Sequence, residues 1–191
     1  MCRGVEGARG GRAVRERSLV WFAVAVPLLV VAATAVVVAG DPVGQVEREE
    51  GLPSLRRLDL DGEIRSLDEW RGRVVLLNFW ASWCPPCQYE IPDFVRWQAE
   101  HGERGLQVVS VGLDAPRKLA NVRRTLGINY PVMVASLEDP GNRGLLERWG
   151  NDSGILPYTV VIDRAGNIVR RHKGRFGDGE FRRYVQPLLA R

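Results

Sequence analysis

Two cysteines, Cys84 and Cys87, are separated by two prolines and follow a long apolar run after three intervening residues. This run, residues 74–80, has the length and composition of a strand that is buried on both faces. Pro85 and Pro86 suit the first turn of a helix, because a proline there removes no intrahelical hydrogen bond. The sequence therefore predicts a buried strand that passes into a helix, with both thiols held rigidly at the junction.

Thiols at this spacing can pass between a dithiol and a disulfide. We expect Cys84, at the helix N-terminus, to be the attacking thiolate and Cys87 to resolve the mixed disulfide. The intervening prolines have no N–H to stabilise the thiolate, which favours a reductant over an oxidant. A structural zinc site needs four ligands, and the chain has only Cys2, His101 and His172 as further cysteine or histidine. We therefore expect redox chemistry, with no metal ion and no other cofactor.

The first forty residues are typical of a membrane anchor. Residues 1–18 carry five arginines and two glutamates, and residues 19–40 are uncharged over a length that can span a bilayer. A basic segment before such a run favours a cytoplasmic tail and export of the remaining chain. A signal peptide cleaved near residues 33–35 is the alternative, but the apolar run exceeds the usual signal core. We expect a retained single-pass anchor.

The exported part is close to electrically neutral. Removing the five basic and two acidic residues of the tail from the totals of 27 and 23 leaves 22 basic and 21 acidic residues in 41–191. Such a balance lacks the clustered positive charge of a nucleic-acid-binding surface, so no nucleic acid is expected. Residues 41–54 are predicted to be a polar linker, and residues 55–191 to be one domain. We expect a monomer.

Strands and helices alternate along this domain, which predicts an α/β fold with a central mixed sheet flanked by helices. A hairpin with an Asp-Gly turn is expected first, followed by a helical turn. The predicted hairpin and helical turn cover 55–65 and 67–71; further strands cover 74–80, 106–113, 132–134, 158–162 and 168–172; helices cover 85–101, 116–126, 142–149 and 179–189.

Three segments resemble the thioredoxin superfamily, and within it the membrane-anchored TlpA/ResA-like thiol–disulfide oxidoreductases. They are LNFWASWCPPC at 77–87, EIP at 90–92 and LPYT at 156–159. The resemblance runs from about residue 52 to the C-terminus. It implies a thioredoxin-like fold with an N-terminal β-hairpin and an inserted β-α unit around residues 114–149. It also implies a catalytic domain on the periplasmic side of the bacterial cytoplasmic membrane.

The resemblance also assigns roles around the cysteines. In thioredoxins an aspartate on the preceding strand assists the resolving thiol, but Asn78 stands at that place here. Glu90 matches an acidic residue of the family, and we expect it to accept the proton or to tune the thiol pKa. Pro157 matches the family's cis-proline, so the backbone of Leu156 is expected to pair with substrate. Trp83 is expected to flank the disulfide, completing the candidate substrate-binding residues.

We therefore expect an extracytoplasmic protein-disulfide reductase acting on client proteins with oxidised cysteine pairs. The resemblance implies clients such as the haem-site cysteines of apocytochrome c or the copper-site cysteines of an oxidase, and a membrane thiol-transfer protein as electron donor. Two alternatives stay open. One is a thiol peroxidase. The other is a copper-carrying module that uses Cys84, Cys87 and a histidine such as His172.

Overall fold

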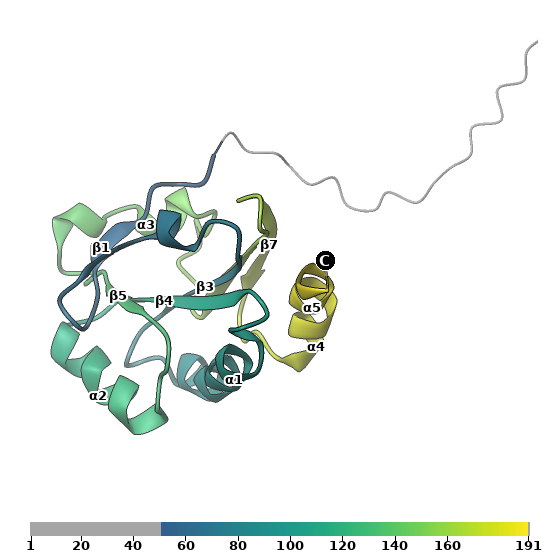
Figure 1. The fold of residues 1–191 in the computed structure, drawn as a ribbon. Coiled ribbons are helices and arrows are strands. Elements are labelled where there is room, and N and C mark those ends of the chain that lie inside the picture. Colours follow the sequence, from purple (N-terminus) through teal and green to yellow (C-terminus); the bar gives the residue numbers. More distant parts are fainter. Residues whose placement is uncertain (1–50, 191) are drawn as a thin grey trace, which may run out of the picture. The chain divides into compact units, whose positions relative to one another are not determined.

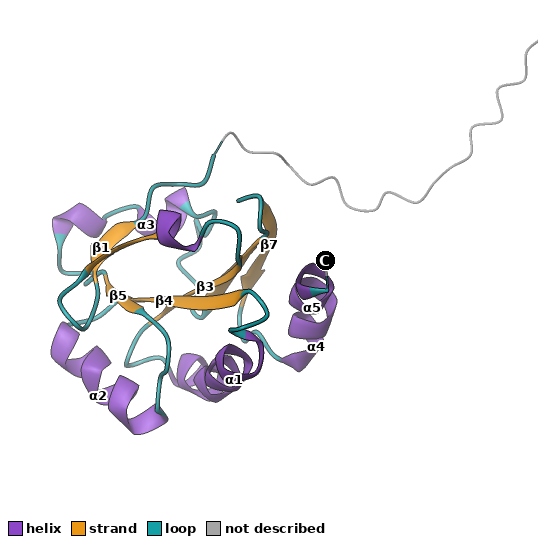
Figure 2. Cartoon of the chain, in the orientation of Figure 1, coloured by secondary structure: helices purple, strands orange, loops and turns teal. Residues whose placement is uncertain are grey.

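The structure is a computed structural model, and it describes residues 51–190. Helices surround a central sheet (Figures 1 and 2). The strands are β1 (Arg56–Leu58), β2 (Ile64–Ser66), β3 (Val74–Trp80), β4 (Leu106–Gly112), β5 (Val132–Val134), β6 (Tyr158–Ile162) and β7 (Ile168–Lys173). The helical elements are η1 (Leu67–Trp70), α1 (Pro85–His101), α2 (Pro116–Leu126), η2 (Pro140–Asn142), α3 (Leu145–Arg148), α4 (Asp178–Glu180), η3 (Phe181–Val185) and α5 (Gln186–Leu189).

The central sheet is mixed, as predicted. Its strand order is β5-β4-β3-β6-β7. β3 pairs in parallel with β4, and β4 with β5, whereas β6 runs antiparallel to both β3 and β7. All seven residues of β3 are buried, which explains why every residue except Asn78 is apolar and why the strand does not alternate between apolar and polar residues. The strand that leads to the cysteines is therefore the middle of the sheet.

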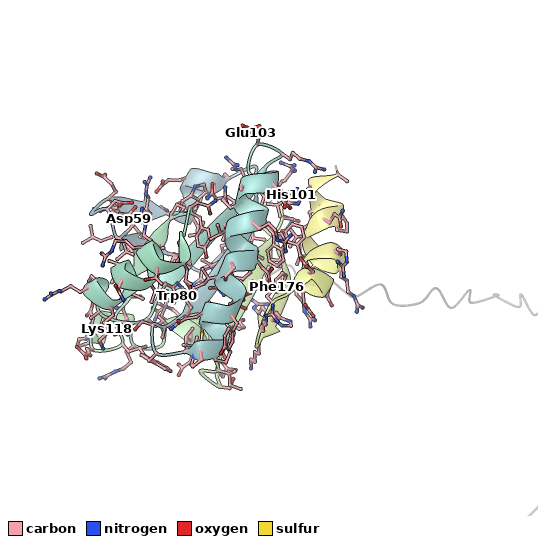
Figure 3. The ribbon with its side chains drawn as sticks, turned by 90° about the horizontal axis from the view of Figure 1, so that it is seen from below. Asp59, Trp80, His101, Glu103, Lys118 and Phe176 are labelled. Carbon is pink, nitrogen blue, oxygen red and sulfur yellow. A yellow bond between two sulfur atoms is a disulfide. The ribbon has the colours of Figure 1, made fainter. Side chains whose placement is uncertain are left out.

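Aromatic packing fixes α1 against the C-terminal helical segment and the loop after β7. The ring of Trp97 on α1 stacks on Phe181, with centroids 4.3 Å apart, and contacts Phe176 edge-on at 6.1 Å. Figure 3 shows Phe176 between α1 and the C-terminal helical segment. On the opposite face of the sheet, Phe79 packs against Trp149 at the end of α3, with centroids 6.0 Å apart. Trp80, expected in the core, is fully buried.

The predicted N-terminal hairpin is present as β1 and β2, which form a separate two-stranded sheet. It is joined to the edge strand β5 by a hydrogen bond of 3.0 Å from the Leu60 N–H to the Val132 carbonyl. A bidentate ion pair between Arg123 of α2 and Asp61 in the hairpin turn adds a second attachment. The expected fold class, a central mixed sheet with flanking helices and an N-terminal hairpin, is confirmed. Residues 114–149, where the inserted β-α unit is expected, contain α2, β5, η2 and α3.

One helix prediction is wrong, and a second helix is present as predicted but contains an irregular turn. The expected helix 142–149 is split into η2 and the single turn of α3. Gly144 lies between them with a φ of 69°, a left-handed conformation that interrupts a regular helix. The expected helix 179–189 contains the π-helical turn η3. There Pro187 has no N–H to donate to the preceding turn, and the Gln186 N–H bonds to the Phe181 carbonyl five residues back.

The predicted tail, membrane anchor and most of the linker lie outside the described residues. Between residues 51 and 190, no helix has the length and apolar character needed to cross a bilayer.

Candidate active site

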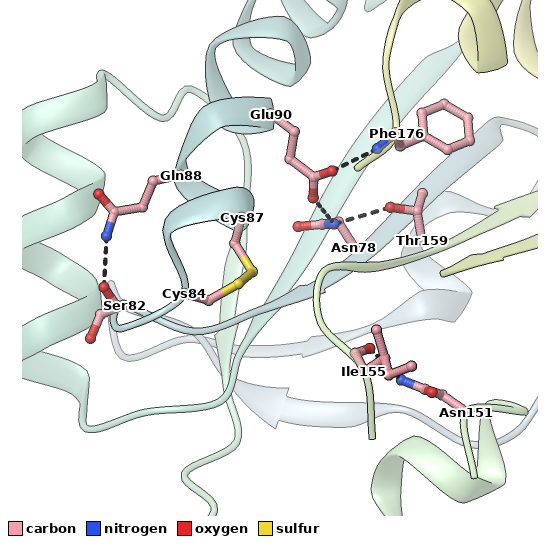
Figure 4. Close-up of a disulfide and its surroundings, with 10 residues drawn as sticks. All are labelled: Asn78, Ser82, Cys84, Cys87, Gln88, Glu90, Asn151, Ile155, Thr159 and Phe176. Atoms are coloured by element: carbon pink, nitrogen blue, oxygen red, sulfur yellow. Dashed lines mark hydrogen bonds between the residues drawn. A yellow bond between two sulfur atoms is a disulfide. The ribbon is translucent and has the colours of Figure 1, made fainter. Parts of the chain in front are cut away.

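The two cysteines form a disulfide at the start of α1. Cys84 is the residue that caps the helix, Cys87 lies in its first turn, and their Cα atoms are 5.3 Å apart. Figure 4 shows the disulfide beside the carboxyl end of β3. Cys84 is 5 % exposed and Cys87 is fully buried. In this oxidised form Cys84 is therefore the more exposed residue of the two, by a small margin only.

The backbone around Cys84 offers its sulfur few donors. Pro85 and Pro86 have no N–H, and the Cys87 N–H donates to the Cys84 carbonyl at 3.1 Å. The Gln88 N–H donates to the same carbonyl at 3.2 Å. The first helical turn therefore supplies the thiolate with its dipole but with no free amide, so the thiolate is only weakly stabilised.

The turn that carries Cys84 is held in place from two sides. The Ser82 hydroxyl makes a short hydrogen bond to the Asp114 carboxylate, which follows β4. The Gln88 side-chain amide donates to the Ser82 carbonyl at 2.7 Å (Figure 4). The Cys84 N–H closes the turn by donating to the Ala81 carbonyl at 3.1 Å. These bonds keep the cysteine at one position relative to β3 and β4.

Glu90 is fully buried between α1 and the sheet, one helical turn after Cys87. Its Oε1 accepts a hydrogen bond of 2.7 Å from Asn78 Nδ2 on β3. Its Oε2 accepts one of 2.8 Å from the Phe176 N–H, in the loop after β7 (Figure 4). Because residues three apart on a helix share a face, Glu90 and Cys87 both point into this buried layer.

Burial raises the pKa of Glu90 to about 8. The hydrogen bonds from the Phe176 N–H and Asn78, together with the positive charge of Arg175, lower it, and the negative charge of Asp93 raises it. Only roughly one tenth of a carboxyl group with this pKa is ionised at pH 7. In the disulfide form, Glu90 is therefore mainly a proton carrier rather than a fixed negative charge.

Two groups hold the Glu90 carboxyl in its buried position: the side chain of Asn78 and the backbone N–H of Phe176. Asn78 donates both to Glu90 and, at 3.1 Å, to Thr159 Oγ1 on β6. Phe176 contributes only a backbone N–H, which leaves no signal in the sequence. The sequence showed that Asn78 stands where thioredoxins have an aspartate. Only the structure shows that Asn78 donates a hydrogen bond to Glu90.

The Leu156–Pro157 peptide bond is cis, as the resemblance implies. The Pro157 carbonyl accepts a hydrogen bond of 2.8 Å from the Gly174 N–H, so the loop before β6 is attached to the same loop that carries Phe176. Pro157 is buried and Leu156 is half-buried. Leu156 precedes β6. Its N–H and carbonyl make no backbone–backbone hydrogen bond within residues 51–190.

Exposed large side chains flank these segments in the sequence. Trp83, Tyr89 and Ile155 are 61 %, 71 % and 51 % exposed. Each lies within two residues of Cys84, Cys87 or Pro157 in the sequence. Large apolar side chains that remain in water next to a reactive group are typical of a surface that is covered by a binding partner.

The structure does not bring His172 together with the cysteines as a metal site. Its Nε2 lies 3.0 Å from the Arg175 carbonyl, and its ring packs edge-on against Phe176. Within the described part of the chain, no three His, Cys, Asp or Glu side chains are grouped to hold a metal ion.

Comparisons with known proteins give a consistent picture. Residues 49–171 match the model of the AhpC/TSA family. The chain is 31 % identical over 135 residues to the thiol-disulfide oxidoreductase ResA of Halalkalibacterium halodurans, covering 68 % of this chain and 72 % of the relative. It is 31 % identical over 150 residues to the thiol:disulfide interchange protein HelX of Rhodobacter capsulatus, covering 78 % and 80 %. A thioredoxin-family thiol:disulfide interchange protein of Chlorobium tepidum has a similar structure, with a TM-score of 0.62 and 33 % identity over 73 % of this chain and 95 % of that one.

Proposed function

We propose that this chain, which belongs to the AhpC/TSA family and is a thioredoxin-like thiol-disulfide oxidoreductase, reduces disulfides of exported client proteins. The reaction uses Cys84 and Cys87. The observation that carries this proposal is the position of the Cys84–Cys87 disulfide, which lies at a helix N-terminus above a buried carboxyl group.

The reaction begins when the Cys84 thiolate attacks one sulfur of a client disulfide. A Cys84–client disulfide forms, and the other client sulfur leaves as a thiolate. Cys87 then loses its proton to the Glu90 carboxylate and attacks Cys84, which releases the second client thiolate. The client gains two electrons and becomes a dithiol, while this protein becomes a disulfide. An external dithiol restores the reduced protein, and Glu90 returns its proton to Cys87.

The first turn of α1 supports the reducing direction. A disulfide is a strong oxidant when its reduced form is stabilised, as happens when the attacking thiolate has several donors. Pro85 and Pro86 remove two of these donors, and the Cys87 N–H is occupied by the Cys84 carbonyl. The reduced form is therefore stabilised only weakly, and it gives up its electrons readily.

The surface around the disulfide supports binding of an extended client segment. The backbone of Leu156 precedes the cis peptide bond and lies outside the strand ladder, so it can pair with a client backbone. Trp83, Tyr89 and Ile155 supply apolar area on either side. Backbone pairing is indifferent to client sequence, so this arrangement suits several clients that share an accessible disulfide.

We also propose that residues 1–18 stay in the cytoplasm, that residues 19–40 anchor the chain in the inner membrane, and that the domain from residue 55 acts on the periplasmic side. The uncharged run after five arginines supports this topology. Protease added to intact spheroplasts should digest the C-terminal domain, and full protection would contradict the proposal. A processed, released form would support the signal-peptide alternative. With the domain anchored on the periplasmic side, a membrane thiol-transfer protein would supply the electrons.

Substrate trapping tests the reaction and identifies the clients. Cys87→Ser should accumulate mixed disulfides through Cys84, because the resolving thiol is missing, whereas Cys84→Ser should form none and have no reductase activity. Cys2→Ser is the matched control and should behave as the parent. Adducts that run through Cys87 would reverse the two roles. The trapped clients would separate apocytochrome c haem-site cysteines from copper-site cysteines.

A further inference from the structure

Three buried polar atoms near Glu90 have no hydrogen-bond partner among the described residues. They are Asn78 Oδ1, Ser110 Oγ and Tyr130 Oη. Asn78 and Ser110 are fully buried, and Tyr130 is 4 % exposed. They belong to a set of eight buried side-chain atoms without such a partner in residues 51–190. Leaving one such group unsatisfied costs on the order of 1–3 kcal/mol, so three of them in one layer beside Glu90 call for an explanation.

The sheet register places these residues in one layer. Asn78 on β3 is paired with Ser110 on β4, so their side chains leave the same face of the sheet. This is the face of α1, because Asn78 donates to Glu90 on that helix. Ser110 is paired in turn with Val132 on β5, and its N–H donates to the carbonyl of Pro131, the neighbour of Tyr130.

Tyr130 lies against the same helix. Asn129 Nδ2 donates to the Val95 carbonyl of α1 at 3.1 Å, which fixes this segment beside the helix. Burial raises the pKa of Tyr130, and the nearby charge of Glu90 raises it further. The phenol therefore stays protonated and keeps an O–H to donate within the layer that contains Glu90.

We propose that Asn78, Ser110 and Tyr130 bind one buried water molecule, and that Ser110 and Tyr130 are thereby positioning residues for proton transfer at Glu90. The three atoms match the capacity of a water: Tyr130 Oη–H donates to it, and it donates to Asn78 Oδ1 and Ser110 Oγ. This inference rests on the proposed role of Glu90 in the resolving step.

The bound water acts on Glu90 through the Asn78 amide. With Oδ1 held by the water, Nδ2 stays directed at Glu90 and Thr159, and the amide cannot turn its oxygen toward the carboxylate. Polarisation of the amide also strengthens its donation to Glu90. The other groups that act on Glu90 are the Phe176 N–H, Arg175, Asp93 and, in the reduced protein, the Cys87 thiol. Loss of the water should therefore favour the protonated carboxyl group and raise the pKa of Glu90.

The test uses the full oxidised chain with Ser110→Ala, Tyr130→Phe and the double variant. Titration of the Glu90 side-chain carbon by nuclear magnetic resonance reports its pKa directly. Each single variant should lower the ionised fraction of Glu90 at pH 7 by about three- to tenfold, which is roughly 0.5–1 pKa unit. Because both residues hold the same water, the double variant should shift the pKa little more than one single variant. Equal and additive effects, or no shift, would overturn the inference.

Two controls separate this inference from the proposed function. Tyr158→Phe removes a buried hydroxyl on the opposite face, where its Oη donates to the Trp149 carbonyl, and it should leave the pKa of Glu90 unchanged. If Glu90→Gln slows resolution while Tyr130→Phe leaves the pKa of Glu90 unchanged, the inference fails and the function stands. If Glu90→Gln resolves mixed disulfides at the parent rate, the role of Glu90 itself is refuted. A crystal structure with no ordered water between Asn78, Ser110 and Tyr130 would also overturn the inference.

Discussion

Replacing Glu90 by glutamine should change how the stability of the oxidised protein depends on pH. In the folded protein the pKa of Glu90 is raised by burial from its ordinary value of 4.5 to about 8. Between these two values the unfolded chain releases the proton while the folded protein keeps it. The free energy of unfolding that depends on Glu90 is therefore fully present below pH 4.5 and is lost as the pH rises through about 8.

The size of this effect follows from the pKa difference. A difference of about 3.5 units, at about 1.4 kcal/mol per unit, corresponds to a loss of about 5 kcal/mol between pH 4.5 and pH 8. This is a large part of the 5–15 kcal/mol that typically stabilises a domain of this kind. Glutamine does not titrate, so Glu90→Gln should remove the fall in the free energy of unfolding between pH 4.5 and pH 8. Any decrease in the free energy of unfolding caused by the glutamine amide that then faces Asn78 Nδ2 is the same at every pH.

Guanidinium unfolding of the full oxidised chain at several pH values measures the effect, because the disulfide cysteines do not titrate in this range. The difference in free energy of unfolding between parent and Glu90→Gln should change by about 5 kcal/mol across the range, in favour of the variant at high pH. Glu100→Gln is the matched control, since Glu100 lies on the same helix with half of its side chain exposed. Parallel pH curves for the parent and Glu90→Gln would refute the argument that Glu90 is buried with a raised pKa.

Four further results are expected. Glu90→Gln should slow resolution of mixed disulfides and shift the thiol titration of the reduced protein to lower pH, because a negative charge beside Cys87 disappears; unchanged thiol pKa values would contradict this. Asn78→Asp should raise the pKa of Glu90 further by like-charge repulsion, measured by carboxyl titration, and a lowered value would contradict the geometry. Pro86→His should restore a donor to the first turn and raise the reduction potential of the disulfide by roughly 30–100 mV, measured by equilibration with glutathione. An unchanged potential would contradict the argument that the thiolate is weakly stabilised. Trp97→Ala should lower the free energy of unfolding by about 3–5 kcal/mol, since its ring is buried against Phe181; a loss below about 1 kcal/mol would contradict this packing.

Local sequence was sufficient for the elements around the cysteines. The run of β3 is apolar apart from Asn78, which predicts burial on both faces, and Pro85 and Pro86 suit the first turn of a helix. The strand–turn–helix unit was therefore predictable with its bounds. The π-helical turn of the C-terminal helix was not predictable in this way. Pro187 lacks an N–H, and the sequence does not say how the preceding turn compensates for this missing donor.

The sequence by itself determined which groups carry the chemistry, since the thiols, their spacing and the absence of donors between them are properties of a few consecutive residues. The tertiary structure decided the state of Glu90. Its partners are Asn78, 12 residues away, and the Phe176 N–H, 86 residues away, and one of them is a backbone group that any residue provides. A glutamate three positions after Cys87 has the same helical pattern whether the opposing surface is solvent or a sheet. Only the packing of α1 over β3, which removes water from that face, turns it into a buried acid with a pKa of about 8.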